Sequence, residues 1–339
     1  MRRTPLQEKL ARPLFVPAVR LDEPPLEGLR LGLCCQFVDE PIRFRTTTAA
    51  ACLKLTAATR AAKLVELCQA NAEALLAALE CCSRLGIGAF RVNSQILPVK
   101  THPEIGYQVE ELPGGAAIIA AFQRCGARAA ELGVRTSFHP DQYVVLSSPR
   151  EEVVDRSLEE IEYQAEIAEW IGADTVNIHG GGAYDSREAA LERFARHLNR
   201  LSPRARARLT VENDDKIYTP VELLPLCRRE GVPLVYDVHH HRCCRDELSI
   251  EEATEQAIAT WDREPLFHLS SPKEGWNGPG CHRHHDFIDP ADVPKCWLGR
   301  SLTIEVEAKA KERAVLQLQR DLQQVGQQRG ATPRGARTP

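Results

Sequence analysis

The run Val176-Asn177-Ile178-His179-Gly180-Gly181-Gly182 reads as a strand that ends at a histidine and passes into a glycine-rich turn. A helical stretch follows it at 186–201, and a second strand-like run lies at 208–213. A strand, a helix and a further strand in this order are the repeating unit of a parallel sheet. The stretch therefore predicts an α/β fold, and the same alternation extends from it in both directions along the chain.

The alternation gives eight strand-like runs, with helical stretches in most of the intervals between them. The runs are Leu29–Cys35, Ala89–Asn93, Arg135–His139, Thr175–His179, Arg208–Asn213, Pro233–His239, Leu266–Ser270 and Leu302–Glu307. The helical stretches are 61–85, 116–132, 151–171, 186–201, 220–230, 250–261 and 311–324, with a short one at 290–297. Eight units in one chain of 339 residues favour a single closed TIM barrel over an open sheet. The first run is followed by bulky residues where a dinucleotide-binding sheet would need glycines.

Length and composition agree with one globular domain. We expect the barrel to span residues 28–325, with an extended arm at 1–27 and a disordered tail at 326–339. Hydrophobic residues make up 43% and charged residues 27%, which excludes a disordered or a fibrous chain. No apolar run approaches the ~20 residues of a membrane span, and the first residues lack the apolar core of a secretory signal, so a cytoplasmic protein is expected. The 12 cysteines are then expected to be free thiols.

Nearly all of the 11 histidines lie at or just beyond the C-terminal end of a predicted strand, together with aspartates and glutamates. These groups are His102, His139, His179, Glu212 to Asp215, Asp237 to His241, His268, His282 to Asp286, Glu305 and Glu307. In a barrel such points converge on one face, so the sequence predicts a metal site at the C-terminal rim. Imidazole and carboxylate together suit Zn²⁺, Mn²⁺ or Fe, and so many groups need two or three ions with bridging carboxylates. Such clusters serve phosphodiester displacement.

Alternation along strands refines this prediction. At most two of His239, His240 and His241 should face the barrel interior if they continue a strand, and Glu307 should lie nearest the rim on its strand. His197 lies inside a helical stretch and is expected to pack or face solvent. Glycines 180–182 either hold a phosphate through backbone amides or let the backbone pass close to the metals.

Five motifs stand out: FRVNSQILP at 90–98, SFHPDQ at 137–142, VNIHGG at 176–181, ENDD at 212–215 and DVHHH at 237–241. Together they resemble the UV damage endonuclease family, and the resemblance extends from about residue 29 to about residue 320. It implies a TIM barrel related to the endonuclease IV abasic-site enzymes. It also implies an enzyme that nicks damaged double-stranded DNA immediately 5′ to cyclobutane dimers and (6–4) photoproducts. The implied cofactors are two or three divalent ions, typically manganese, with zinc or magnesium as alternatives.

The resemblance also implies roles for individual residues. The implied metal ligands are His102, His139, His179, Glu212, Asp237, His240, His268, His284 and Glu307, among which Glu212, His179 and Asp237 are the expected catalytic residues. Gln142 and Tyr143 match the pair that the family inserts at the lesion, although Tyr143 could instead pack under the next helix. Many members carry a lysine, in some carboxylated, two residues before the histidine of strand seven. This chain has Leu266 at that position, so no carboxylated lysine is expected there.

The residues by themselves lead to a multinuclear metal enzyme on a barrel, and two other classes of protein remain open. A sugar isomerase or epimerase on a similar barrel would need fewer ligands and a closed pocket. A non-catalytic damage-binding or metal-storage protein would carry the ligands without nicking DNA. The net charge of −4 provides no overall attraction to nucleic acid, and nothing in the sequence indicates a membrane or a protein partner.

Overall fold

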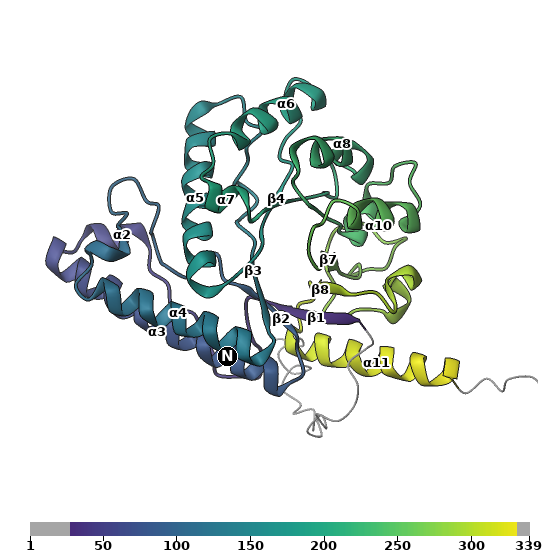
Figure 1. Ribbon diagram of the computed structural model, residues 1–339, viewed down its shortest axis with the longest axis horizontal. Coiled ribbons are helices and arrows are strands. Elements are labelled where there is room, and N and C mark those ends of the chain that lie inside the picture. The colour runs from purple at the N-terminus through teal and green to yellow at the C-terminus, as the bar shows by residue number, and fades with distance from the viewer. Residues whose placement is uncertain (1–27, 331–339) are drawn as a thin grey trace, which may run out of the picture.

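The computed structural model describes residues 28–330, and its centre is a sheet of eight parallel strands in the order β6-β5-β4-β3-β2-β1-β8-β7. The strands are β1 (Leu29–Cys34), β2 (Ala89–Val92), β3 (Arg135–Phe138), β4 (Val176–His179), β5 (Leu209–Glu212), β6 (Leu234–Val235), β7 (Leu266–Leu269) and β8 (Leu302–Val306). Figure 1 shows them at the centre of the molecule, with long helices packed around them.

Helices occupy the chain segments between the strands. They are α2 (Ala49–Leu53), α3 (Ala57–Arg84), α4 (Gly115–Leu132), α5 (Glu151–Ile171), α6 (Arg187–Leu198), α7 (Pro203–Arg206), α8 (Pro220–Glu230), α9 (Val238–Cys243), α10 (Ile250–Ile258) and α11 (Glu312–Gly330). Short 3₁₀ turns are η1 (Val109–Glu111), η2 (Pro290–Asp292) and η3 (Lys295–Trp297). The bounds of α5 and α8 are those expected from the sequence, because each helix ends at a left-handed glycine, Gly172 and Gly231. None of the helices in residues 28–330 is long and apolar enough to cross a membrane.

The two ends of the sheet meet, which closes the barrel. Residue Asp237, just beyond β6, forms a parallel bridge with His268 of β7. The amide of His268 also donates a hydrogen bond to the carbonyl of Tyr236 at 3.1 Å. The predicted TIM barrel is therefore confirmed, with its closure made at the residues that carry the candidate site.

The strands divide their side chains between two environments. Outward-facing residues such as Phe90, Ile178 and Phe267 belong to the hydrophobic core between the strands and the helices. The alternate positions face the barrel interior, and most of them are polar. These buried polar residues are Arg91, Ser137, Asn177, Thr210, Glu212, His268, Thr303 and Glu305. The barrel interior therefore supports the rim with charged and hydrogen-bonding groups.

The expected sixth strand is wrong beyond Val235. The side chain of Asp237 accepts a hydrogen bond from the amide of His240 at 2.8 Å, which begins the short helix α9. An aspartate at this position satisfies an amide that the first turn leaves without a partner, so it stabilises a helix over a continued strand. His239, His240 and His241 consequently point in three directions around α9, and the alternation expected of a strand does not apply to them.

The expectations for the two ends of the chain are corrected only in part. Helix α11 continues to Gly330, so residues 326–330 are helical where a disordered tail was expected. Gly326 weakens a helix by about 1 kcal/mol relative to alanine but does not by itself end it. The arm at 1–27 and the tail residues 331–339 lie outside the described residues. All 12 cysteines are free thiols, as expected.

Candidate metal centre

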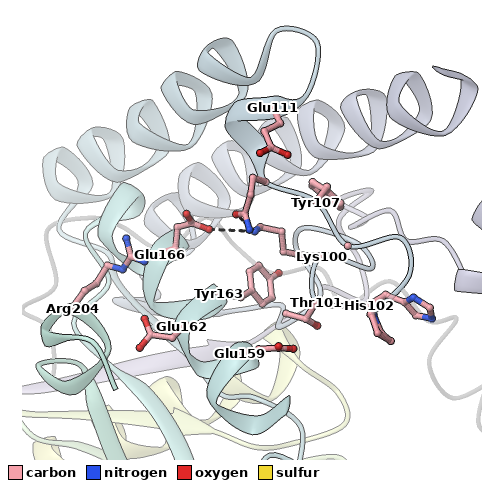
Figure 2. Close-up of a pocket in the computed structure, with 13 residues that line it drawn as sticks. Lys100, Thr101, His102, Tyr107, Glu111, Glu159, Glu162, Tyr163, Glu166 and Arg204 are labelled. Carbon is pink, nitrogen blue, oxygen red and sulfur yellow. Dashed lines mark hydrogen bonds and ion pairs between the residues drawn. The ribbon is translucent and has the colours of Figure 1, made fainter. Parts of the chain in front are cut away.

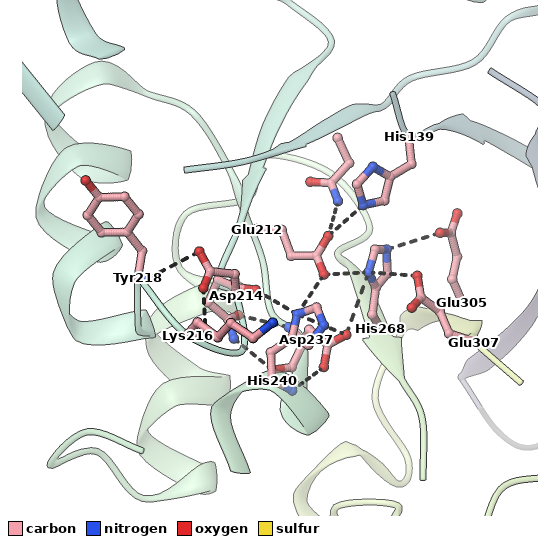
Figure 3. Close-up of polar contacts among 12 residues, drawn as sticks. His139, Glu212, Asp214, Lys216, Tyr218, Asp237, His240, His268, Glu305 and Glu307 are labelled. Carbon is pink, nitrogen blue, oxygen red and sulfur yellow. Dashed lines mark hydrogen bonds and ion pairs between the residues drawn. The ribbon is translucent and has the colours of Figure 1, made fainter. Parts of the chain in front are cut away.

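Six side chains from six neighbouring strand ends meet at the C-terminal rim of the barrel. They are His139 after β3, His179 of β4, Glu212 of β5, Asp237 after β6, His268 of β7 and Glu307 after β8. His240 joins them from the first turn of α9, and Figure 3 shows Glu212 between these groups. The convergence follows from the fold, because parallel strands of a barrel all end on the same face.

The ligand atoms of these residues form three overlapping groups. The groups are His139, His179 and Glu212; Glu212, Asp237 and His240; and Asp237, His268 and Glu307, each with its atoms within 4.8 Å of one another. Glu212 and Asp237 each belong to two groups. Shared carboxylates of this kind are the arrangement that bridges neighbouring cations, and mixed imidazole and carboxylate donors suit zinc and manganese.

Glu212 is the most connected residue of the centre. One oxygen, Oε2, lies 3.0 Å from His139 Nε2 and accepts a hydrogen bond of 2.6 Å from the Asn177 amide. The other, Oε1, lies 3.0 Å from His268 Nδ1 and 3.2 Å from His240 Nδ1. Burial would raise the pKa of Glu212, but the surrounding histidines hold it well below its usual value. The carboxylate is therefore ionised and able to bind cations on both sides.

Without added cations, the carboxylates of the centre are neutralised by Arg91 and by protons on neighbouring imidazoles. Arg91 pairs with Glu305 and with Glu307, its Nη1 lying 2.6 Å from Glu307 Oε1. Glu212 and Asp237 instead form ion pairs with histidines. Burial would lower the pKa of His268, yet the Glu212 carboxylate raises it to about 10. These carboxylates thus hold protons on nearby imidazoles, which divalent ions can replace.

Three ligand atoms of the centre are among the buried polar atoms that have no hydrogen-bond partner in the described part of the chain: His179 Nδ1, Asp237 Oδ2 and His268 Nδ1. Buried polar atoms are normally paired, so each of these calls for an explanation. Burial lowers the pKa of His179, which leaves its imidazole neutral and able to act as a ligand. Two of the atoms belong to residues of the same group, Asp237 and His268, so the donor set fits a divalent cation.

The three histidines of α9 have different roles. His240 faces Glu212, and its Nδ1 also lies 2.9 Å from the carbonyl of Asn213. His241 points away from the centre and contacts the Tyr236 hydroxyl at 2.7 Å and Asp246 at 2.9 Å. His239 packs against the ring of Trp276, with centroids 5.1 Å apart. Of these three histidines, only His240 belongs to a ligand group, as the resemblance implied.

The remaining two implied ligands lie outside these groups. His284 lies at the edge of the centre, with its Nδ1 3.5 Å from Glu307 Oε2. His102 is not brought to the groups, because the turns after β2 hold it elsewhere: its carbonyl accepts from Gly106 at 2.7 Å and its Nδ1 from Glu104 at 3.2 Å. It lines a separate cavity of about 530 Å³ with Lys100 and Glu166 (Figure 2).

Gln142 and Tyr143 lie on the loop after His139, beside the centre. They line an open cavity of about 560 Å³ together with Arg91, Asn93 and His139. The Tyr143 side chain is 67% exposed and donates a hydrogen bond to Asp141 at 3.0 Å. This exposure argues against the alternative that Tyr143 packs under the next helix.

Close packing explains Gly181 of the glycine run after β4. Gly181 has φ +86°, and a Cβ there would lie 2.2 Å from the Ser147 hydroxyl and 3.3 Å from Val145. The close approach is therefore to the loop after β3, which is neither of the two interpretations drawn from the sequence. His197 packs as expected, with its Nδ1 2.7 Å from the carbonyl of Leu146.

Sequence reasoning assigned no role to Arg91 or Asn177, and it placed Glu305 among the rim groups without a role of its own. Each is a polar residue at an inward position of an apolar strand, and that is the signal that could have found them. Asn177 and Arg91 contact ligands directly, and Glu305 contacts His268. The structure thus adds a layer of supporting groups beneath the predicted ligands.

Comparisons with known proteins agree with this geometry. A family model described as UV-endonuclease UvdE matches residues 29–333. The UV DNA damage endonuclease of Bacillus velezensis is 31% identical over 291 residues, which cover 82% of this chain and 88% of that protein. The protein of the same name from Bacillus pumilus is 32% identical over 252 residues, covering 70% of this chain and 75% of its own.

Solved structures show the same similarity. The crystal structure of SacUVDE aligns with a TM-score of 0.77 and 25% identity, covering 88% of this chain and 99% of that one. Endonuclease IV from Thermus thermophilus aligns with a TM-score of 0.54 and 16% identity, covering 87% and 99%. D-psicose 3-epimerase from Clostridium cellulolyticum aligns with a TM-score of 0.50 and 12% identity, covering 75% and 92%. The last two show a shared fold alone.

Proposed function

This chain belongs to the UV-endonuclease UvdE family and is a DNA repair endonuclease, and we propose that it uses divalent metal ions to nick DNA immediately 5′ to UV photoproducts. Membership of a family of DNA endonucleases decides against the sugar isomerase and the non-catalytic alternatives. The single observation that carries the metal dependence is the set of three ligand groups that share Glu212 and Asp237.

The proposed ligands are the seven residues of these groups: His139, His179, Glu212, Asp237, His240, His268 and Glu307. His284, 3.5 Å from Glu307, completes the set at the edge, and His102 is left out because the structure holds it in another cavity. Three overlapping groups support two or three ions, with manganese as the proposed metal and zinc or magnesium as the alternatives. Divalent ions in such clusters activate water and neutralise charge on a phosphodiester in displacement reactions.

The chain's own residues prepare the site for this chemistry. Asn177 donates to Glu212 and fixes the orientation of its carboxylate. Asn213 and Asp237 exchange two hydrogen bonds, of 2.9 and 3.0 Å, so the ends of β5 and β6 hold their carboxylates side by side. Arg91 places a fixed positive charge beneath Glu307. Residues held in this way keep ligands within the narrow geometry that catalysis needs.

The proposed substrate is damaged double-stranded DNA, with Gln142 and Tyr143 as the residues that probe the lesion. Tyr143 presents an exposed ring beside the centre, and an aromatic ring stacks on any unpaired base. Bases at a photoproduct are already poorly stacked, so the cost of displacing them is lower than in intact DNA. Recognition by deformability rather than by base sequence suits a protein with a net charge of −4 and a metal-rich site.

A duplex with one cyclobutane dimer and a 5′-end label tests the proposal. The metal-depleted protein should leave it intact, and added Mn²⁺ should yield one product that ends directly 5′ to the dimer. The undamaged duplex of the same sequence is the control. Nicking at full rate without metal, or cleavage at another position, would contradict the proposal.

A further inference from the structure

Glu305 is a buried carboxylate beneath the candidate metal centre that belongs to none of the three ligand groups. It lies on β8 directly opposite His268 of β7 in the register of the two strands. Its two oxygens are both engaged: Oε1 accepts from the Ser137 hydroxyl and Oε2 from Arg91 Nε. Oε2 also lies 3.1 Å from His268 Nε2, a contact drawn in Figure 3.

The two ring nitrogens of His268 face different neighbours. Nδ1 points to the ligand groups, 3.0 Å from Glu212 Oε1 and 3.6 Å from Glu307 Oε1. Nε2 points down into the barrel, between Glu305 and Arg91 Nη2, which is 2.9 Å away. A neutral imidazole carries its one proton on one nitrogen, so the partner of Nε2 decides whether Nδ1 has a lone pair for a cation.

The two neighbours of Nε2 require opposite tautomers. A guanidinium only donates, so pairing with Arg91 needs a lone pair on Nε2 and places the proton on Nδ1, facing the ligand groups. A carboxylate only accepts, so pairing with Glu305 places the proton on Nε2 and leaves Nδ1 free. Histidines that bind metals almost always donate their other N–H to a carboxylate or a carbonyl, and losing that partner weakens metal binding about 10- to 100-fold.

We propose that Glu305 is a positioning residue that holds His268 in the tautomer that binds a divalent cation through Nδ1. Ser137 and Arg91 hold the carboxylate in place, and Arg91 also balances its charge. This inference rests on the metal-binding part of the proposed function. It adds the orientation of one ligand, and it gives a reason why a buried carboxylate that belongs to none of the ligand groups lies beneath them.

The test compares Mn²⁺ binding to the full chain and its variants by calorimetry, after the chelator has been removed. Glu305→Met keeps the length of the side chain but removes the acceptor, and it should weaken the dissociation constant for Mn²⁺ by about 10- to 100-fold. Glu305→Gln keeps a neutral acceptor and should be intermediate. Glu264→Gln is the matched control, because Glu264 pairs with Arg30 and Thr303 and does not contact His268.

A second readout reports the tautomer directly. The pKa of His268 in the metal-free protein is about 10, so ¹⁵N spectra are recorded above that pH, where its ring carries one proton. That proton should be on Nε2 in the wild type and shift toward Nδ1 in Glu305→Met. Wild-type affinity in both Glu305 variants, or the same loss in Glu264→Gln, would overturn the inference. If Glu305→Met does not fold, wild-type affinity in Glu305→Gln overturns it. A wild-type protein that binds Mn²⁺ but does not nick irradiated DNA would contradict the proposed function and leave this inference standing.

Discussion

Replacing Gln142 and Tyr143 together by alanine should weaken binding to a damaged duplex by about ten- to a hundredfold, because the stacking of one aromatic ring on a base contributes roughly 1–3 kcal/mol and 1.4 kcal/mol is tenfold. The fold should tolerate the change. Tyr143 is 67% exposed, and its one side-chain hydrogen bond is to Asp141, itself exposed. Surface substitutions of this kind usually change the free energy of unfolding by about 0.5 kcal/mol or less.

The assay is the dissociation constant for a duplex with one cyclobutane dimer, measured by fluorescence anisotropy in Ca²⁺ to prevent cleavage. Tyr143→Phe keeps the ring and should bind nearly as the wild type does. Leu53→Ala removes another exposed apolar side chain, 46% exposed on α2, and should have no effect. Metal content should be unchanged in all variants. Normal binding by the double variant, or loss of its cooperative unfolding, would refute the probing role and favour a packing role.

Three further predictions concern the metal centre. Glu212→Gln should abolish nicking and lower Mn²⁺ content while circular dichroism stays that of the wild type, because Glu212 belongs to two ligand groups; full activity would contradict its bridging role. Activity should not depend on dissolved CO₂, because the buried Leu266 cannot form a carbamate, and an assay in CO₂-free buffer with and without bicarbonate checks this. Burial would raise the pKa of Glu305, but Arg91 and His268 lower it to about 2. The ionised Glu305 should therefore contribute to the free energy of unfolding above pH 4.5, and this contribution should be lost as the pH falls towards 2. Urea unfolding of the metal-free protein should therefore show a shallower loss in Glu305→Gln than in the wild type over this range.

The sequence by itself determined the barrel and most of its rim. The alternation of strand and helix is a local pattern that can be found in the sequence. In a parallel barrel all strands end on the same face, and active sites are built on that face. His139, His179, Glu212, His268 and Glu307 could therefore be assigned to one site from their places at strand ends. In the three-dimensional structure all five residues belong to the ligand groups, as their places at strand ends predicted.

Only the tertiary structure decided how that rim is completed. The chain turns into α9 because Asp237 caps a helix, and this selects His240 from three adjacent histidines. The turns after β2 keep His102 away from the centre, although it too follows a strand. Both outcomes depend on hydrogen bonds in the loops, whose geometry residue spacing does not specify.

The contacts that the supporting groups make beneath the ligands were likewise decided by the tertiary structure. Glu305 of β8 meets His268 of β7 because these two strands are paired. Arg91 of β2 contacts both residues, because the closed barrel brings β2 within reach of them across its interior. A strand pattern tells which side chains point inward, but the register between distant strands decides which of them touch. The sequence thus determined the kind of site, and the packing of strands far apart in the chain decided which nitrogen of His268 faces the ligand groups.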